Sequence, residues 1–151
     1  MSDILHANAL LYGTSGLLLR GPSGSGKSTL TLQLLHEAER RGVYAALVAD
    51  DRTAVETING RLVASPPAEL AGLMEIRGLG IARLPHRPAA ILTHVVDLVA
   101  AGWPDRLPGD ADRTQRIAGL PLPRIALRAD EAGAVERLGT ALSAPAFLDM
   151  E

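Results

Sequence analysis

An eight-residue glycine-rich motif limits what this chain can fold into more than any other feature of its sequence. Residues 21–28 read Gly-Pro-Ser-Gly-Ser-Gly-Lys-Ser and match the P-loop pattern G-x-x-x-x-G-K-[ST] at every required position. Glycines let successive backbone N–H groups turn towards phosphate oxygens, and a helix that begins at Lys27 adds the positive end of its dipole. Lys27 would reach the terminal phosphates of a nucleotide, and the Ser28 hydroxyl would bind Mg²⁺. The predicted nucleotide-binding residues are Gly21, Pro22, Ser23, Gly24, Ser25, Gly26, Lys27, Ser28 and Thr29.

The segments on either side of the motif predict the strand and the helix that a P-loop requires. Residues 4–12 and 17–20 have the composition of two strands joined by a glycine-containing turn, and the second strand leads directly into the motif. Residues 27–42 predict a helix, because apolar residues recur on one face and a glycine closes the segment. The apolar residues of that face are Leu30, Leu34, Leu35 and Ala38. This arrangement favours a nucleotide site over a chance glycine-rich turn.

The rest of the chain predicts a mixed sheet. Residues 44–49 are a short continuous apolar run, as expected of a central strand buried on both faces. Asn59-Gly60, between two runs that alternate in character, is the strongest β-hairpin signal in the sequence. Further strands are predicted at residues 73–77, 81–84, 90–96 and 124–128, a surface segment at 103–119 and a closing helix at 131–142. We therefore expect a single α/β domain of the P-loop NTPase type over residues 1–151, with a mixed central sheet, flanking helices and a β-hairpin.

Two adjacent carboxylates, Asp50 and Asp51, follow the apolar run at residues 44–49. A strand that ends in an acid has the form of a Walker B segment, which holds Mg²⁺ directly or through water. One acid is enough for the metal, so its neighbour is available as a base for an incoming hydroxyl group. A solvated turn or a helix cap is the alternative interpretation of the pair. Asp97 is a competing metal-binding candidate, but Leu98 and Val99 continue its apolar run and place it inside an element.

Composition narrows the class of partner and the compartment. The formal net charge is −2 and aromatic residues are 3% of the chain, so no basic field or stacking platform for nucleic acid is expected. The N-terminus has no basic segment followed by a long apolar one, and the most apolar stretch, residues 89–103, is interrupted by polar residues. The sequence contains no cysteine, which fits a reducing compartment. We therefore expect a cytoplasmic protein that binds neither membrane nor nucleic acid.

Several further motifs resemble one family in this order along the chain. Residues 74–81 read Met-Glu-Ile-Arg-Gly-Leu-Gly-Ile, and Ala-Asp-Asp-Arg stands at residues 49–52. Asp-Arg-Leu stands at residues 105–107 and Pro-Leu-Pro-Arg at residues 121–124. With His6 in the first strand, these motifs resemble the HPr kinase/phosphorylase family over nearly the whole chain, from His6 to about Arg128. The P-loop alone is generic, whereas the motif at 74–81 is specific in this order.

The resemblance implies an activity. Members of that family use ATP and Mg²⁺ to phosphorylate a serine of HPr, a small phosphocarrier protein, and so regulate a phosphotransferase system. They can reverse the reaction with inorganic phosphate. By resemblance, an HPr-like phosphocarrier is the expected protein partner of this chain. The rival interpretations are a small-molecule kinase and a nucleotide-binding sensor that no longer transfers phosphate. A GTPase is disfavoured because the sequence contains no Asn-Lys-x-Asp motif.

The resemblance also implies roles for individual residues. Lys27 stabilises charge on the phosphates, and Ser28, Asp50 and Glu75 are metal ligands. Asp51 is the base for the acceptor serine, although the two acids could exchange roles. His6 supports that carboxylate, and Arg106 neutralises charge on the transferring group. His36, His86 and His94 belong to no motif and are expected in surface or core positions.

The sequence departs from the family pattern in five places. We expect no counterpart of the family's separate N-terminal domain, and the stretch between residues 80 and 90 is shortened. The helix predicted after the P-loop is more than a turn longer. The C-terminus follows soon after one predicted helix. Arg124 stands where the family has a lysine in a strand linked to the reverse reaction. These departures predict kinase rather than phosphorylase chemistry and a homo-oligomer smaller than a hexamer.

Overall fold

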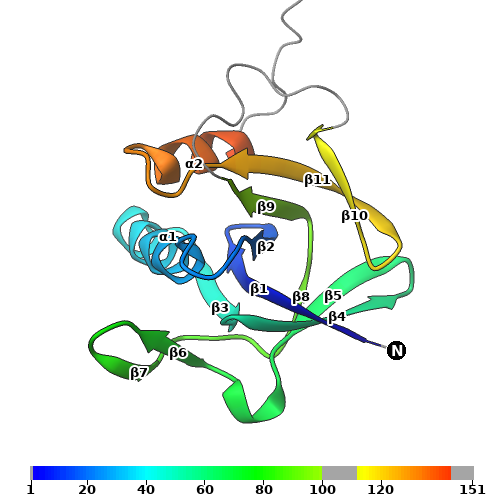
Figure 1. Ribbon diagram of the computed structural model, residues 1–151, viewed down its shortest axis with the longest axis horizontal. Helices are drawn as coiled ribbons and strands as arrows, with labels where there is room; N and C mark the ends of the chain where they lie inside the picture. Colours follow the sequence, from blue (N-terminus) through cyan, green and yellow to red (C-terminus); the bar gives the residue numbers. More distant parts are fainter. Residues whose placement is uncertain (1, 100–111, 144–151) are drawn as a thin grey trace, which may run out of the picture.

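More of the described chain is in β-strands than in helices. The structure is a computed structural model, and it describes residues 2–99 and 112–143. Within these residues, nine strands form one sheet in the order β10-β11-β9-β2-β1-β4-β5-β8, with β3 paired to β1 beside this path (Figure 1). The β9 strand is parallel to both β2 and β11, and the other pairings are antiparallel. The mixed sheet expected from the sequence is thereby confirmed.

Strand β1 organises the sheet because three other strands pair with it. β1 spans Asp3–Tyr12 and forms a hairpin with β2, Ser15–Arg20. Along its other edge, residues 9–12 pair with β3, Ala45–Ala49, and residues 3–6 pair with β4, Arg52–Ile58. The edge therefore changes partner at residues 7 and 8, and the two-residue connection between β3 and β4 lies at this change.

The P-loop segment joins β2 to the first helix. α1 spans Lys27–Arg41, and its last turn is closed by Gly42, which adopts the left-handed conformation that favours glycine. The apolar face of the helix packs on the sheet: Leu30 and Leu34 are fully buried against Leu17 and Leu19 of β2. The predicted helix and its buried face are confirmed, apart from Leu35, which is only partly buried.

The strand predicted at residues 44–49 is present as β3 and is largely buried, but its predicted central position is wrong. β3 pairs with one strand, β1, and on its other edge it forms only an isolated parallel bridge between Leu47 and His86. Its outer edge is closed by the chain at residues 85–87, where Leu47 N donates to Pro85 O and Arg87 N donates to Leu47 O. A continuous apolar run indicates that both faces of a strand are covered, but it does not indicate whether one or both of its edges pair with other strands.

The predicted β-hairpin is present and extends the sheet away from α1. β4 and β5, Arg61–Ser65, are joined by Asn59 and Gly60, whose φ angles of 51° and 74° suit a type I′ turn. β8, Ala90–Ile91, pairs with β5. The single strand predicted at residues 90–96 is divided in the structure, because Leu92 and Thr93 separate β8 from β9, His94–Leu98.

A second, two-stranded sheet lies next to α1. β6, Leu73–Ile76, and β7, Gly80–Arg83, form a hairpin that the sequence predicted as two short extended pieces. A short 3₁₀ helix, Ala68–Leu70, precedes β6. The hairpin carries the residues of the motif at 74–81 and lies on the side of α1 opposite α2 (Figure 1).

The C-terminal part contains one strand more than predicted. β10, Thr114–Ile117, forms a hairpin with β11, Leu120–Leu127, and α2, Ala134–Ser143, follows. The sequence predicted a surface segment over 103–119 and missed β10, because its residues are mostly polar. Residues 103–111 of that segment lie outside the described residues.

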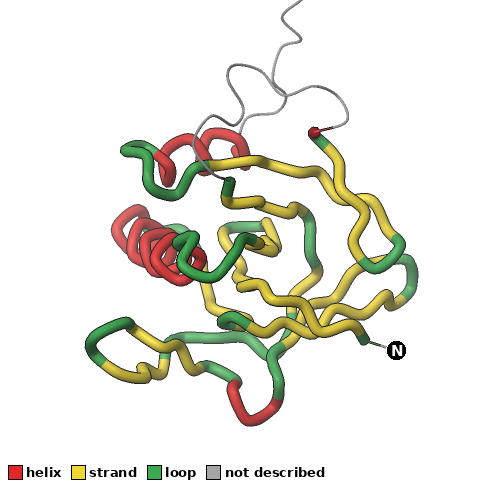
Figure 2. Tube along the Cα trace, viewed as in Figure 1, coloured by secondary structure: helices red, strands yellow, loops and turns green. Residues whose placement is uncertain are grey.

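Two hydrophobic clusters fill opposite sides of the curled sheet. Both α-helices pack against one side, on a cluster that includes Leu17 and Leu19. The other cluster, which includes Leu18, is formed by residues of the strands and by Leu92, with no residue from a helix. Figure 2 shows the strands curling round on themselves on the side away from the α-helices. The Thr57 hydroxyl donates to Ala118 O at 3.2 Å and links the β4–β5 hairpin to the β10–β11 turn. No helix among the described residues is long and apolar enough to cross a membrane.

Asp97 lies within β9 and is held by two arginines. Its carboxylate accepts hydrogen bonds from Arg20 at 2.8 Å and from Arg124 at 2.6 Å, and its side chain is 13% exposed. Burial acts to raise the pKa of Asp97, but the hydrogen bonds and positive charges of the two arginines outweigh it and hold the pKa below its ordinary value. This ion-paired position inside a strand supports the lower rank that the sequence gave Asp97 as a metal ligand.

We predict that Asp97→Asn lowers the free energy of unfolding by about 2 kcal/mol at pH 7, because it leaves two arginines without their carboxylate. Because the pKa of Asp97 is lowered in the folded chain, its contribution is complete above a pH of about 4 and is lost as the pH falls through the lowered pKa. Urea unfolding of the parent and of Asp97→Asn should therefore show a smaller difference in the free energy of unfolding at pH 3 than at pH 7. The exposed Asp130 pairs with Arg128, and Asp130→Asn is the matched control that should change little.

Candidate active site

The P-loop takes a conformation that its glycines permit. Gly24 and Gly26 have φ angles of 80° and 102°, which side chains rarely adopt. A Cβ atom at Gly26 would also stand 3.1 Å from Ala129, so the segment after β11 lies against the loop at this point. The backbone bends immediately before α1, as the motif predicted.

The Lys27 side chain lies along the loop. It is 6% exposed, and its Nζ atom donates to Gly21 O at 2.8 Å and to Pro22 O at 3.3 Å. The ammonium group therefore bridges the beginning of the loop and the beginning of the helix. A cation held against this loop is placed to neutralise phosphate charge.

The residues predicted to bind metal come together from three elements. The Ser28 hydroxyl, at the start of α1, donates to Asp50 Oδ1 at 2.7 Å. The other oxygen of Asp50 accepts a 3.2 Å hydrogen bond from the Glu75 backbone N–H in β6. The Ser28 hydroxyl and the Asp50 carboxylate are oxygen donors of the kind that hold Mg²⁺ beside phosphates and water. These two groups therefore fit Mg²⁺, whereas the contact of Glu75 with Asp50 is made by its backbone.

Asp51 has a different side-chain partner from its neighbour Asp50. Its φ angle of 66° places it in the left-handed region, which is uncommon for a residue other than glycine. Its backbone is tied to β1 on both sides, because Ala7 N donates to Asp51 O at 3.1 Å and Asp51 N donates to Asn8 Oδ1 at 2.8 Å. Its carboxylate contacts His6 Nε2, and these side chains are 59% and 50% exposed, respectively. The two adjacent acids thus have different partners.

A cleft of about 530 Å³ unites these groups. It is lined by P-loop residues, by the first turns of α1 and by both acids, and also by Glu75, Ile76 and Arg77. Of the predicted site residues, the structure therefore brings together the P-loop, Asp50, Asp51 and Glu75, with His6 in contact with Asp51. Arg106 lies outside the described residues.

Asn8 is a residue of this region that the sequence analysis did not select. It is fully buried in β1, and its side chain contacts Ser28, Thr31, Asp50 and the backbone of Asp51. It belongs to no motif. The signal that could have found it is an amide side chain in a strand whose neighbouring residues, Ala7 and Ala9, are small and apolar.

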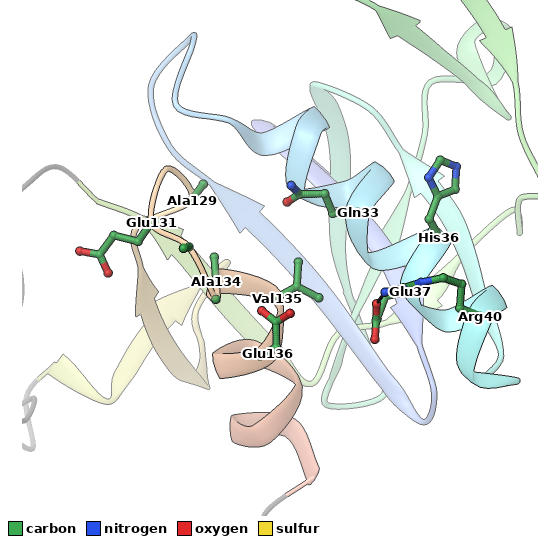
Figure 3. A pocket seen from close by; sticks show the side chains of 11 residues that line it. Gln33, His36, Glu37, Arg40, Ala129, Glu131, Ala134, Val135 and Glu136 are labelled. Carbon is green, nitrogen blue, oxygen red and sulfur yellow. Dashed lines mark hydrogen bonds and ion pairs between the residues drawn. The ribbon is translucent and has the colours of Figure 1, made fainter.

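A second hollow, of about 540 Å³, lies between α1 and the segment around the start of α2 (Figure 3). Gln33, Glu37 and Val135 are among its lining residues, and it shares no residue with the cleft of the acid pair. His36 also lines it and is exposed, which agrees with the expected surface position. His94 is only partly exposed, and burial lowers its pKa.

Comparison with known proteins identifies the family. Residues 2–87 match the family described as the HPr Serine kinase C-terminal domain. The chain belongs to this family. The matched segment contains His6, the P-loop, both acids and Glu75, and it ends before β9.

Individual relatives and a solved structure agree with this assignment. The chain is 38% identical over 92 residues to an HPr kinase/phosphorylase of Clostridium tetani, covering 61% of the chain and 27% of the relative. It is 34% identical over 134 residues to an HPr kinase/phosphorylase of Limosilactobacillus reuteri, covering 82% of the chain and 40% of the relative. The chain thus spans less than half the length of either relative. The Hpr(Ser) kinase/phosphatase structure from Coxiella burnetii has a TM-score of 0.76 and 26% identity, and the match covers 93% of this chain and 87% of that one.

We predict that Lys27→Ala weakens MgATP binding at least roughly 10-fold, because it removes a charged donor from the phosphate site. Isothermal titration calorimetry measures the change. Arg40→Ala is the matched control, since Arg40 is an exposed cation on the same helix and lies outside the cleft. Equal MgATP affinity in Lys27→Ala and the parent would show that Lys27 is not a phosphate ligand.

Proposed function

We propose that this chain is an ATP- and Mg²⁺-dependent protein kinase that phosphorylates a serine of an HPr-like phosphocarrier protein and so regulates a phosphotransferase system. One observation carries the proposal: a single cleft contains a P-loop and two adjacent acids that face different partners. Membership of the HPr Serine kinase C-terminal domain family supports the type of acceptor. Because the chain spans only part of its relatives, the activity is tested on this chain itself.

The proposed roles follow from the contacts of each side chain. Ser28, Asp50 and Glu75 would hold Mg²⁺, which supplies positive charge to the phosphates of ATP. Lys27 would neutralise phosphate charge from the loop side. The Asp51 carboxylate would accept the proton of the acceptor hydroxyl while that oxygen bonds to the γ-phosphorus and the bond to the β-phosphate breaks. His6 would orient Asp51 through their direct contact. Arg106 keeps its proposed role of neutralising the transferring group.

The exposure of the base supports a macromolecular acceptor. The Asp51 side chain is 59% exposed and its partner His6 is 50% exposed, so both are accessible at the surface of the cleft. Enzymes that act on small molecules commonly bury most of the ligand surface in a concave pocket. An accessible base suits a serine that is presented by another folded protein.

The contacts of Arg124 support the forward direction. In this chain Arg124 Nε donates to Asp97 and its Nη1 donates to Asp112 O at 3.1 Å, so the guanidinium takes part in structural contacts. Arginine presents a planar fork where lysine presents a compact charge, and the two do not bind phosphate in the same geometry. We therefore propose that kinase chemistry dominates over phosphorylase chemistry. That the chain forms a homo-oligomer smaller than a hexamer stays a prediction. Light scattering, which measures the mass of the assembly in solution, tests it.

Incubation with labelled ATP, Mg²⁺ and an HPr-like protein from the same cell should produce acid-stable label on serine. Replacement of the acceptor serine by alanine should abolish the label. Label found only in small molecules would instead identify a small-molecule kinase, and nucleotide binding without any transfer would identify a sensor. Pyrophosphate release from phosphorylated HPr and inorganic phosphate, at the rate of the forward reaction, would contradict the proposed direction.

The two acids should respond differently to neutralisation. Asp51→Asn should lower the transfer rate by roughly 10²- to 10⁴-fold and leave ATP affinity largely unchanged, because it removes only the base. Asp50→Asn should instead raise the Mg²⁺ concentration required for half-maximal activity. Steady-state kinetics across a Mg²⁺ series distinguishes the two patterns. The reverse pattern would exchange the roles of the acids, and full activity in both variants would contradict this site.

A further inference from the structure

We propose that Asn8 is a positioning residue that holds the two acids in their separate orientations, and this inference rests on the proposed function. Asn8 is fully buried at the point where the edge of β1 changes partner from β3 to β4. Its amide group lies opposite the connection that carries both acids, and it makes one contact with the side chain of Asp50 and another with the backbone of Asp51.

The neighbours of Asn8 fix the orientation of its amide group. The Asp51 backbone N–H can only donate, and it donates to Asn8 Oδ1 at 2.8 Å. An ionised Asp50 carboxylate can only accept, and its Oδ1 receives Asn8 Nδ2 at 3.0 Å. If the amide were flipped, its NH₂ group would face the Asp51 N–H and its oxygen would face the Asp50 carboxylate, and neither pair could form a hydrogen bond. The carbonyl oxygen of Asn8 therefore accepts from Asp51, and its amino group donates to Asp50.

The amino end of Asn8 also reaches α1. Nδ2 lies 3.2 Å from Thr31 Oγ1 and 3.4 Å from Ser28 Oγ. The Thr31 hydroxyl donates its own hydrogen to Lys27 O at 2.8 Å, so its oxygen is available to accept from Asn8. Asp50 Oδ1 thus receives two donors, one from Ser28 and one from Asn8. Asn8 would still donate to Asp50 if the Ser28 hydroxyl bound a metal ion instead.

The carbonyl end stabilises an uncommon backbone conformation. Asp51 has a φ angle of 66°, and such a conformation persists only where surrounding contacts impose it. The hydrogen bond to Asn8 Oδ1 and the one between Ala7 N and Asp51 O hold this residue from both sides. A relaxed Asp51 would turn its carboxylate away from His6. Asn8 thereby sets the direction of the proposed base without touching the acceptor.

Only a side chain that carries a donor and an acceptor at this spacing can donate to Asp50 and also accept from the Asp51 N–H. Leucine has a similar size and offers neither group, so it would leave Asp50 and the Asp51 N–H without this partner. Serine offers a single hydroxyl group on a side chain that is shorter than that of asparagine. Residues that support metal ligands from behind commonly change metal affinity or activity by about 10- to 100-fold when replaced.

The test compares Asn8→Leu and Asn8→Ser with Thr53→Val. Thr53 is an equally buried residue of the adjacent strand β4, and its hydroxyl donates to Ala7 O at 2.8 Å without touching either acid. Urea unfolding and circular dichroism first establish which variants fold. Calorimetric titration with a non-hydrolysable ATP analogue across a Mg²⁺ series then measures metal-dependent binding, and kinetics with HPr separates kcat from KM.

We expect Asn8→Leu to lower kcat by roughly 10- to 100-fold and to raise the Mg²⁺ requirement of analogue binding by roughly 10-fold. Asn8→Ser should show smaller losses in the same direction, and it provides the measurement if the leucine variant does not fold. Thr53→Val should reduce stability and leave kcat and the Mg²⁺ requirement within about 2-fold of the parent. A folded Asn8 variant with the parent's kcat and Mg²⁺ response would overturn the proposal. Absence of HPr phosphorylation by the parent would reject the proposed function alone, because analogue binding still reports on Asn8.

Discussion

The change of partner along one edge of β1 is the constraint on which the rest of the site depends. Residues 9–12 pair with β3 and residues 3–6 pair with β4, so the chain must leave one pairing and begin the other within two residues. Those two residues are Asp50 and Asp51. The short connection forces a left-handed conformation at Asp51, and its carboxylate turns towards His6 while that of Asp50 turns towards Ser28. Strand pairing thereby gives two consecutive acids two different environments. The P-loop lies close to the acid pair because it follows β2, which also pairs with β1.

The same pairing explains how much the sequence could predict. The helix α1, the β4–β5 hairpin and the position of the acids after an apolar strand are local signals, and the structure agrees with each. The nucleotide-binding role of the glycine-rich motif stays a prediction. The central position predicted for residues 44–49 failed because hydrophobicity reports covered faces and not paired edges. β10 was missed because its residues are mostly polar, and it is defined by pairing with β11. Asn8 was missed for a related reason, since its four partners lie 20 to 43 residues away and no local spacing reveals them.

Burial and exposure divide the site into a metal side and an acceptor side. Asn8 and Thr31 are fully buried behind Asp50, so the groups that would support Mg²⁺ are held among well-packed elements. His6 and Asp51 are half exposed, so the groups that would meet the acceptor face solvent. Glu75 and Arg77 of the separate β6–β7 hairpin also line the cleft. A buried support for a metal ion and an accessible base for a protein serine would be compatible within one cleft, because Asn8 and His6 lie only two residues apart on β1.

The ion-paired carboxylate of Asp97 has a mechanical consequence for the nucleotide loop. Arg20 is the last residue of β2 and immediately precedes Gly21, so one arm of the ion pair is fastened to the first residue of the loop. Arg124 belongs to β11, whose continuation brings Ala129 against Gly26 at the far end of the same loop. One carboxylate in β9 therefore anchors both flanks of the loop to a single strand. Both flanks of the loop are thus linked to one carboxylate that does not itself line the cleft.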